Sequence, residues 1–134
     1  MKKEKNQAVR ESLFKAYRAG DQEAVRACLA PDFVLYESKG HAFAGTYKGA
    51  EGFFEFMKKS PHVYAIESIK LIREYWCEDP DYAVFEQHNT GTVKATGEKF
   101  DTTLLEYWHF HDGKVATVKP FWLDIPGCVA TKTI

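Results

Sequence analysis

The chain has 134 residues, with 18 Lys and Arg, 19 Asp and Glu, and a formal net charge of −1. This balance argues against nucleic acid as a partner, because nucleic-acid binding requires a basic face. Hydrophobic residues make up 45% and aromatic residues 15% of the chain, which excludes disorder and is typical of one globular domain over residues 1–134.

The sequence shows no sign of export or membrane insertion. The charged stretch MKKEKNQAVRE lacks the apolar segment of a signal peptide, and no apolar run is long enough to span a bilayer. Cys28, Cys77 and Cys128 are far apart and odd in number, which favours a reducing compartment over a disulfide framework or a zinc site. We therefore expect a cytoplasmic protein without membrane contact.

The first half of the chain is dominated by helical patterns. Apolar residues recur at helical spacing over residues 4–19, which predicts an amphipathic helix that ends at a glycine. Asp21 offers an N-cap oxygen for a second, short helix, and Pro31 is expected to end that helix. A third helix is predicted over residues 50–59, with Pro61 at its end.

Strand patterns fill the rest of the chain. Between the second and third helices FVLYES alternates, with Phe33, Leu35 and Glu37 on one side, and residues 41–49 are expected to be extended. Long β-branched and aromatic runs separated by EDPD, ATGE and HDGK turns follow: 63–76, 82–96, 99–111 and 114–125. Such an order predicts an α+β fold with helices against one sheet face, followed by a loose tail over 127–134.

Several stretches carry a resemblance to a known family. AYRAGDQEAVRACLAPDFVLYESKG, YKGAEGFFEFM and DGKVATVKPFWLD, in this order, resemble the nuclear transport factor 2-like superfamily. That superfamily includes ketosteroid isomerases, SnoaL-like polyketide cyclases and limonene epoxide hydrolases. The resemblance implies a cone-shaped, cystatin-like fold, in which a curved mixed or antiparallel sheet and three N-terminal helices surround a conical hydrophobic pocket.

The resemblance also implies roles for acidic residues. In ketosteroid isomerases the general base lies on the first strand, three residues before a glycine, and here Glu37 stands three residues before Gly40. Their protonated carboxylic acid, the known example of an acid kept neutral by apolar surroundings, lies on the strand that leads into the final hairpin, where Glu106 stands. Cyclases of the superfamily use a carboxylate on the last strand, which corresponds to Asp124.

One element of the isomerase site is missing. The phenol donor on the first helix falls near Leu13, which cannot donate a hydrogen bond. Tyr17 lies one turn further along the same helix face and is the candidate substitute. This departure speaks against true steroid isomerisation.

The chemistry of such a pocket follows from its expected wall. The residues expected to line it and to bind the substrate are Tyr17, Phe33, Phe53, Met57, His88, Trp108 and Trp122. Apolar surroundings disfavour an ionised carboxylate, so the pKa of Glu37 or Glu106 is expected to rise. Two carboxyl groups in one dry pocket also separate in pKa, which leaves one protonated while the other ionises. Proton transfer beside a carbonyl requires such a pair and no metal or organic cofactor.

Other placements of the acids are open at this point. Periodicity does not decide which face of the strand points inward, and the competing inward set is Tyr107, His109 and His111. Glu106 then points outward or pairs with Arg73. Glu37 and Asp124 also fit solvated strand ends.

A metal site is not favoured. A hairpin that turns at Thr96–Gly97 sets His88 opposite about Leu105, so that His109 lies about 13 Å from the level of His88. We therefore predict no metal, and expect His88 to be a further polar group in the pocket.

The function predicted from these observations is cofactor-independent acid–base catalysis of the isomerase, cyclase or lyase type on a small apolar carbonyl compound. The alternatives are a non-catalytic small-molecule binding protein of the same fold and an epoxide hydrolase-like activity. Large residues such as Tyr75, Trp76 and Tyr107 are expected on the sheet face that helices leave open, which predicts a homodimer through that face.

Overall fold

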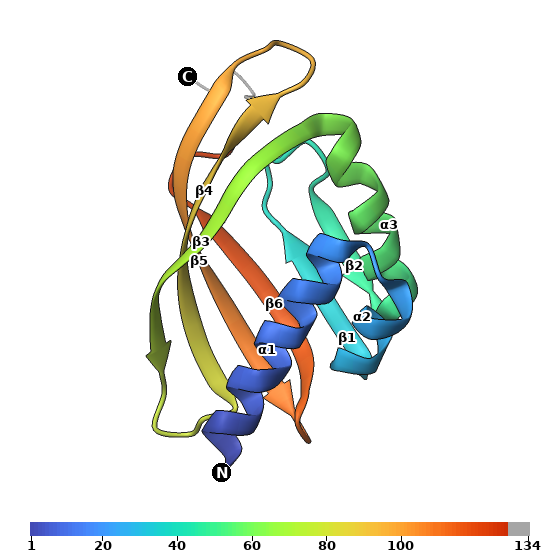
Figure 1. Ribbon diagram of the computed structural model, residues 1–134, viewed down its shortest axis with the longest axis vertical. Helices are drawn as coiled ribbons and strands as arrows, with labels where there is room; N and C mark the ends of the chain where they lie inside the picture. The colour runs from blue at the N-terminus through green and yellow to red at the C-terminus, as the bar shows by residue number, and fades with distance from the viewer. Residues whose placement is uncertain (129–134) are drawn as a thin grey trace.

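The structure, a computed structural model, describes residues 1–128 (Figure 1). Its helices are α1 (Lys2–Ala19), α2 (Gln22–Cys28) and α3 (Gly49–Val63). Its strands are β1 (Leu29–Glu37), β2 (Gly45–Lys48), β3 (Tyr64–Trp76), β4 (Tyr82–Val93), β5 (Lys99–His111) and β6 (Lys114–Trp122). The predicted α+β class, with three helices and a curved mixed sheet, is confirmed. None of the helices in the described residues is long and apolar enough to cross a membrane.

One sheet positions every other element. Its six strands follow the order β2-β1-β6-β5-β4-β3. β1 and β6 run parallel, and the other neighbouring strands are antiparallel. In Figure 1 the long strands β3, β4 and β5 curl so that the sheet wraps around the side on which α1 and α3 lie. The concave face and the apolar sides of these helices therefore enclose the interior.

The curl has local causes in β3 and β4. The pairing of these strands shifts between Ile66 and Ser68 and again between Leu71 and Arg73, as in β-bulges. A Cβ atom on Gly91 would lie 2.5 Å from the backbone oxygen of β3, so only glycine permits this close approach. These irregularities bend the sheet and open space beneath it.

The predicted start of the chain matches the structure. α1 ends at Gly20, whose φ of 68° is the left-handed conformation that glycine adopts readily. The Asp21 side chain then accepts the Ala24 N–H at 3.1 Å and caps α2. Both signals were readable from residue types alone.

Two prolines behave differently from the prediction. Pro31 does not end α2, which ends earlier, but lies inside β1. The pairing of β1 with β6 shifts between Leu29 and Val34, so the missing N–H of Pro31 falls in an irregular stretch. α3 continues past Pro61, because its missing N–H removes only the bond to the Met57 carbonyl.

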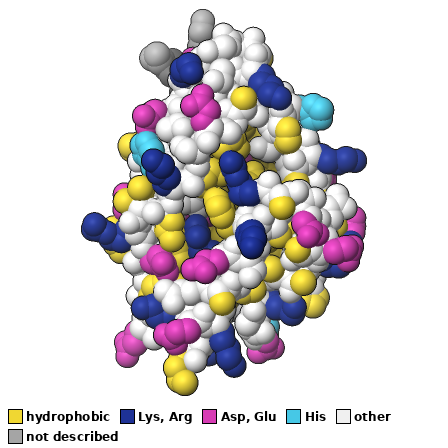
Figure 2. Space-filling view, in the orientation of Figure 1, with side chains coloured by type: hydrophobic (Ala, Val, Ile, Leu, Met, Phe, Trp, Pro, Cys, Tyr) yellow, Lys and Arg dark blue, Asp and Glu magenta, His cyan; other side chains and the backbone are white. Residues whose placement is uncertain are grey.

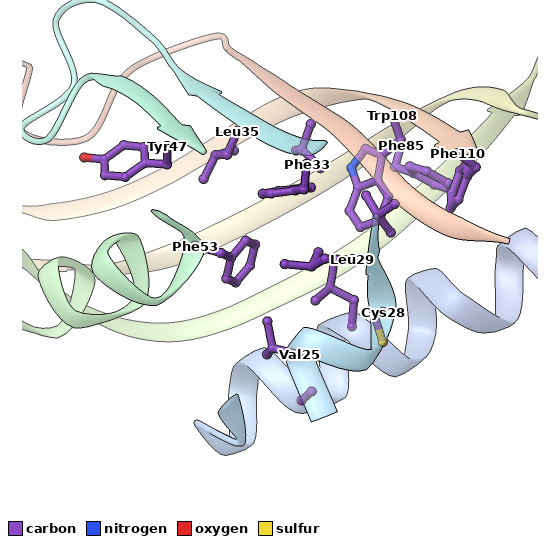
Figure 3. Packing of buried hydrophobic residues seen from close by; sticks show 14 of the residues in the cluster. Val25, Cys28, Leu29, Phe33, Leu35, Tyr47, Phe53, Phe85, Trp108 and Phe110 are labelled. Carbon is purple, nitrogen blue, oxygen red and sulfur yellow. The ribbon is translucent and has the colours of Figure 1, made fainter. Parts of the chain in front are cut away.

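Aromatic and aliphatic side chains together form the core beneath the sheet (Figure 3). Phe33 of β1 and Phe53 of α3 meet with ring centroids 5.6 Å apart. Trp108 lies 5.4 Å from Phe85 and 5.7 Å from Phe110 in a second group on β4 and β5. The side of β5 that carries Trp108 and Phe110 is therefore the inner side.

Candidate active site

A cavity of about 130 Å³ lies between the concave sheet face, α1 and α3. A dry apolar cavity of roughly 150 Å³ is enough to hold benzene, so the volume suits a small organic molecule. On the side of the molecule seen in Figure 2, hydrophobic side chains gather in the middle, with charged side chains between and around them. Most of the wall is apolar, and its polar or charged members include Arg10, Glu37, His41, Ser60, Gln87, Asn89 and Glu106.

Glu37 ends β1 and faces this cavity, with its side chain 2% exposed. Its Oε1 accepts the Ser38 backbone N–H at 2.9 Å and the Trp122 Nε1–H at 3.0 Å. Burial raises the pKa of Glu37 to about 7; the two N–H donors oppose the rise, and the charge of Glu106 adds to it. The structure thus places Glu37 in the interior and not at a solvated strand end.

Glu106 lies in the middle of β5, is partly buried and also faces the cavity. Gln87 Nε2 and Trp108 Nε1 both donate to its Oε1, the indole at 3.1 Å. Burial raises the pKa of Glu106, while Arg10 and the two donors oppose that rise. Arg73, the partner considered from the sequence, is exposed instead.

The two carboxyl groups stand at one level of the sheet, with β6 between them. Glu106 pairs with Pro120 of β6. Leu35 of β1 pairs with Val118 in parallel, so two residues further along both strands Glu37 lies level with Pro120. Because neighbouring strands lie about 4.8 Å apart, the two Cα atoms are about 10 Å apart. A small molecule bound over Pro120 can therefore contact both carboxyl groups.

The two sites are built alike. In each carboxyl group the donors among the described residues bind Oε1, and one of the two donors is an indole N–H. None of these hydrogen bonds reaches Oε2, so this oxygen is the one available to a bound molecule. Two tryptophans thus hold two acids in defined orientations.

His41 and Tyr64 complete the surroundings of Glu37, and neither was among the predicted site residues. His41 Nε2 lies 3.8 Å from Glu37 Oε2 and 3.3 Å from the Tyr64 hydroxyl. His41 occupies the irregular connection between β1 and β2, where no periodicity reports which way a side chain points. Its only sequence signal is an imidazole four residues after an acid.

Arg10 was also missed. Its guanidinium carbon lies 4.5 Å from the centre of the Phe85 ring, and burial lowers the pKa of Arg10. Among the described residues, Arg10 Nε and Asn89 Oδ1 are buried without a hydrogen-bond partner. Orphaned buried groups of this kind destabilise a fold, which is consistent with a cavity shaped for a ligand. The helical spacing of Arg10, Leu13 and Tyr17 was the available signal.

Four of the predicted lining residues do line the cavity: Tyr17, Phe53, Trp108 and Trp122. Burial raises the pKa of the Tyr17 phenol, so it keeps its proton and can donate a hydrogen bond. The competing inward set Tyr107, His109 and His111 lies on the opposite side of β5 from Trp108.

Two predicted polar residues lie elsewhere. β6 ends at Trp122, and Asp124 beyond it is exposed, with its backbone bound to Thr102 Oγ1. Strand alternation would put Asp124 on the same sheet face as Trp122, but β6 and its alternation end at Trp122. His88 is on the outer face, because the cavity side of β4 carries its neighbours, and His88 contacts Asp101 there. Both expectations are corrected.

Two predicted apolar residues are also displaced from the wall. Phe33 is completely buried in the core behind Phe53, and Met57 is partly buried against the core and outside the cavity wall.

The β4–β5 hairpin pairs His88 with Thr103 and not with Leu105, because the turn centres about one residue earlier than predicted. Within residues 1–128, no group of three or more His, Cys, Asp or Glu side chains is placed to hold a metal ion.

The comparison with protein families agrees with this architecture. The model of the SnoaL-like domain matches residues 10–118, and the chain therefore belongs to the SnoaL-like family. A search of curated proteins finds no match.

Solved structures resemble the chain along most of its length. A nuclear transport factor 2-like protein from Burkholderia xenovorans superposes with a TM-score of 0.77 at 18% identity, covering 89% of each chain. A candidate isomerase from Bacillus subtilis gives 0.76 at 15% identity, covering 91% of this chain and 88% of its own. TerC, co-crystallised with polyporic acid, gives 0.71 at 20% identity, covering 88% of this chain and 91% of its own. At these identities the likeness concerns the fold.

Proposed function

We propose that this SnoaL-like protein catalyses cofactor-independent proton transfer on a small apolar carbonyl compound, as an isomerase, cyclase or lyase. One observation carries the proposal: two carboxyl groups of raised pKa face one apolar cavity, and each is held by an indole N–H. A buried acid of this kind costs stability, and such pairs are typical of acid–base sites.

Glu37 is the general base of the proposed reaction. With a pKa of about 7, roughly half of its carboxyl groups are ionised at neutral pH. A base with such a pKa is often in the ionised form that accepts a proton, and it also binds that proton strongly. Its Oε2 takes the proton from the carbon beside the substrate carbonyl. The C–H electron pair then forms the enolate, whose oxygen carries the charge.

Glu106 is the proton donor. In the reactive state of the pair one carboxyl group is ionised and the other protonated: Glu37 is the ionised group, and Glu106, whose neutral form burial favours, donates its Oε2–H to the enolate oxygen. In an isomerase, Glu37 returns the proton to another carbon of the conjugated system. In a cyclase, the enolate carbon attacks a second carbonyl carbon, and the oxygen of that carbonyl takes up the proton held by Glu37. Tyr17, on the opposite wall, is a further hydrogen-bond donor.

Two of the structural neighbours support this class of ligand. The Bacillus subtilis neighbour is a candidate isomerase, and TerC was crystallised with an organic acid. They share the fold at low identity, so they support a small organic ligand without specifying which one. Epoxide hydrolysis in this superfamily uses an arginine between two acids, and Arg73, the main strand arginine that could serve it here, is exposed.

Exchange of α-protons in deuterium oxide tests the proposal without knowledge of the product. Simple cyclic ketones and β,γ-enones are incubated with the protein, and loss of the α-proton signal is followed by NMR. Glu37→Gln is expected to abolish exchange, and Glu106→Gln to slow it at least tenfold. Glu86→Gln, on the outer side of β4, is the matched control and is expected to leave the rate unchanged.

The competing function is binding without turnover. If no carbonyl compound in the panel exchanges, while calorimetry shows that an aromatic or ketone ligand still binds both wild type and Glu37→Gln, the catalytic proposal is refuted and the binding function stands.

We also propose that a second copy covers the outer sheet face. Phe121 is 60% exposed, Tyr75 46% and Leu105 42%, all on this face. Trp76, expected there, instead turns inward and packs against Phe85 and Phe110. The remaining exposed side chains still form a continuous apolar surface that a symmetric dimer would bury.

A further inference from the structure

His41 is a buried imidazole in the connection between β1 and β2. It is 5% exposed and lies among three aromatic rings, with centroids 4.3 Å away for Phe43, 5.5 Å for Tyr64 and 5.8 Å for Trp122. Trp122 is the same residue that holds Glu37 Oε1. The ring therefore has little freedom to turn and stands directly beside the proposed base.

The hydrogen bonds of His41 fix where its proton lies. The Phe43 backbone N–H donates to Nδ1 at 3.3 Å, so in the neutral ring the proton is on Nε2. Burial lowers the pKa of His41 to about 4, and the ring is neutral at physiological pH. The Tyr64 hydroxyl donates its own proton to the Pro126 carbonyl at 2.7 Å. Its oxygen is left to accept the Nε2–H at 3.3 Å.

We propose that His41 is a positioning residue for Glu37, with its Nε2–H shared between the Tyr64 oxygen and Glu37 Oε2. The inference rests on the proposed function, because it explains how the base Glu37 is directed. The 3.8 Å from Nε2 to Oε2 is longer than a hydrogen bond, and contacts of catalytic groups commonly shorten when the substrate binds or the charge develops.

When this contact shortens, Glu37 has a third donor. Ser38 and Trp122 hold Oε1, and His41 restrains Oε2, so the plane of the carboxylate is fixed toward the cavity. A neutral donor stabilises the ionised carboxylate and not its protonated form. His41 therefore keeps Glu37 more acidic than its burial alone would leave it.

The other titratable groups around Glu37 do not replace this donor. They are Tyr17 from α1, Tyr64 from β3, Glu106 from β5 and, beside Tyr64, Cys128 after β6. Burial is the main reason that the pKa of Tyr17 and that of Tyr64 are raised, so both phenols stay neutral. The cation Arg10 acts on Glu106.

The indole of Trp122 reports the ionisation of Glu37 directly. The chain has three tryptophans, so a ¹H–¹⁵N spectrum shows three indole signals, and Trp122→Phe identifies the relevant one. Its chemical shift is followed from pH 5 to pH 9. Glu37→Gln is the control that must abolish the titration. No substrate is required.

Two substitutions of His41 distinguish the roles of its two ring nitrogens. In His41→Asn the amide lies at the position of Nδ1 and the Nε2–H donor is lost, whereas in His41→Gln an amide N–H lies near the position of Nε2. We expect His41→Asn to raise the Trp122 midpoint by about one unit, and His41→Gln to keep it within about 0.3 of the wild-type midpoint.

Tyr64→Phe is the third variant and removes a single oxygen. Without that oxygen the Nε2–H has Glu37 Oε2 as its remaining acceptor, and the Trp122 midpoint is expected to fall by about half a unit. Because this change is small, it tests the same link even if His41→Asn does not fold. Equal midpoints for His41→Asn and His41→Gln, or an unchanged midpoint in Tyr64→Phe, would overturn the inference. A lack of α-proton exchange would instead refute the proposed function and leave these titrations as they are.

Discussion

Replacing Glu37 by glutamine should change how stability depends on pH. The pKa of Glu37 rises from an ordinary 4.5 to about 7 on folding, so the folded state holds a proton that the unfolded chain releases above pH 4.5. The stability that this proton provides is present below pH 4.5 and is lost as the pH rises through 7. At about 1.4 kcal/mol for each unit, the loss is about 3 kcal/mol.

Glutamine is isosteric with the acid and does not titrate in this range. The free energy of unfolding of Glu37→Gln, minus that of the wild type, is therefore expected to rise by about 3 kcal/mol between pH 4.5 and 7.5. Urea denaturation followed by circular dichroism at four pH values across this range gives the difference, with Glu86→Gln as the control. A difference that stays constant with pH would refute the reasoning, because it would mean that Glu37 titrates as an exposed acid.

His41 provides an opposing test with the same measurement. Its pKa falls from 6.5 to about 4 on folding, so its contribution to stability is present above pH 6.5 and is lost as the pH falls through 4. The two contributions nearly cancel between pH 4.5 and 6.5. The unfolding free energy of His41→Asn relative to the wild type should therefore fall by about 3 kcal/mol as the pH rises from 4 to 6.5.

Three further substitutions test the site, the sheet and the outer face. Trp122→Phe removes an N–H donor from Glu37 and should raise the pKa that governs the acid side of the pH–rate profile by about one to two units. Trp76→Phe, whose indole donates to Glu74 instead, should leave that pKa unchanged. Gly91→Ala places a Cβ 2.5 Å from the β3 backbone and should lower the urea midpoint; an unchanged midpoint would show that the bend relaxes freely. Phe121→Asp should convert a dimer to a monomer in analytical ultracentrifugation, and a wild type that is already monomeric contradicts the proposed interface.

The fold was readable from the sequence because its signals are local and repeated. Helical spacing, the glycine at position 20 and the Asp21 cap each act within a few residues, and alternation marks the strands. The two proline errors have one cause. Proline removes one hydrogen bond, and whether that matters depends on a partner strand or carbonyl that the sequence alone does not supply.

The site was only partly readable, because alternation tells which residues share a face but not which face is inside. The sequence therefore left open whether Glu106 or Tyr107 points inward, and in the structure the buried Phe85 and Phe110 identify the inner side. The prediction for Asp124 was wrong for a different reason: alternation ends with the strand at Trp122.

A pattern within single strands does mark the cavity once the inner side is known. On β4 the inward residues begin and end apolar, with Ala83 and Val93, but include Gln87 and Asn89 between them. On β5 Glu106 interrupts the apolar inward row of Leu104, Trp108 and Phe110 in the same way. Packing alone does not tolerate polar groups there without partners. Their occurrence at neighbouring levels on adjacent strands therefore indicates a shared polar patch inside an apolar wall, and the proposed proton transfer would take place at this patch.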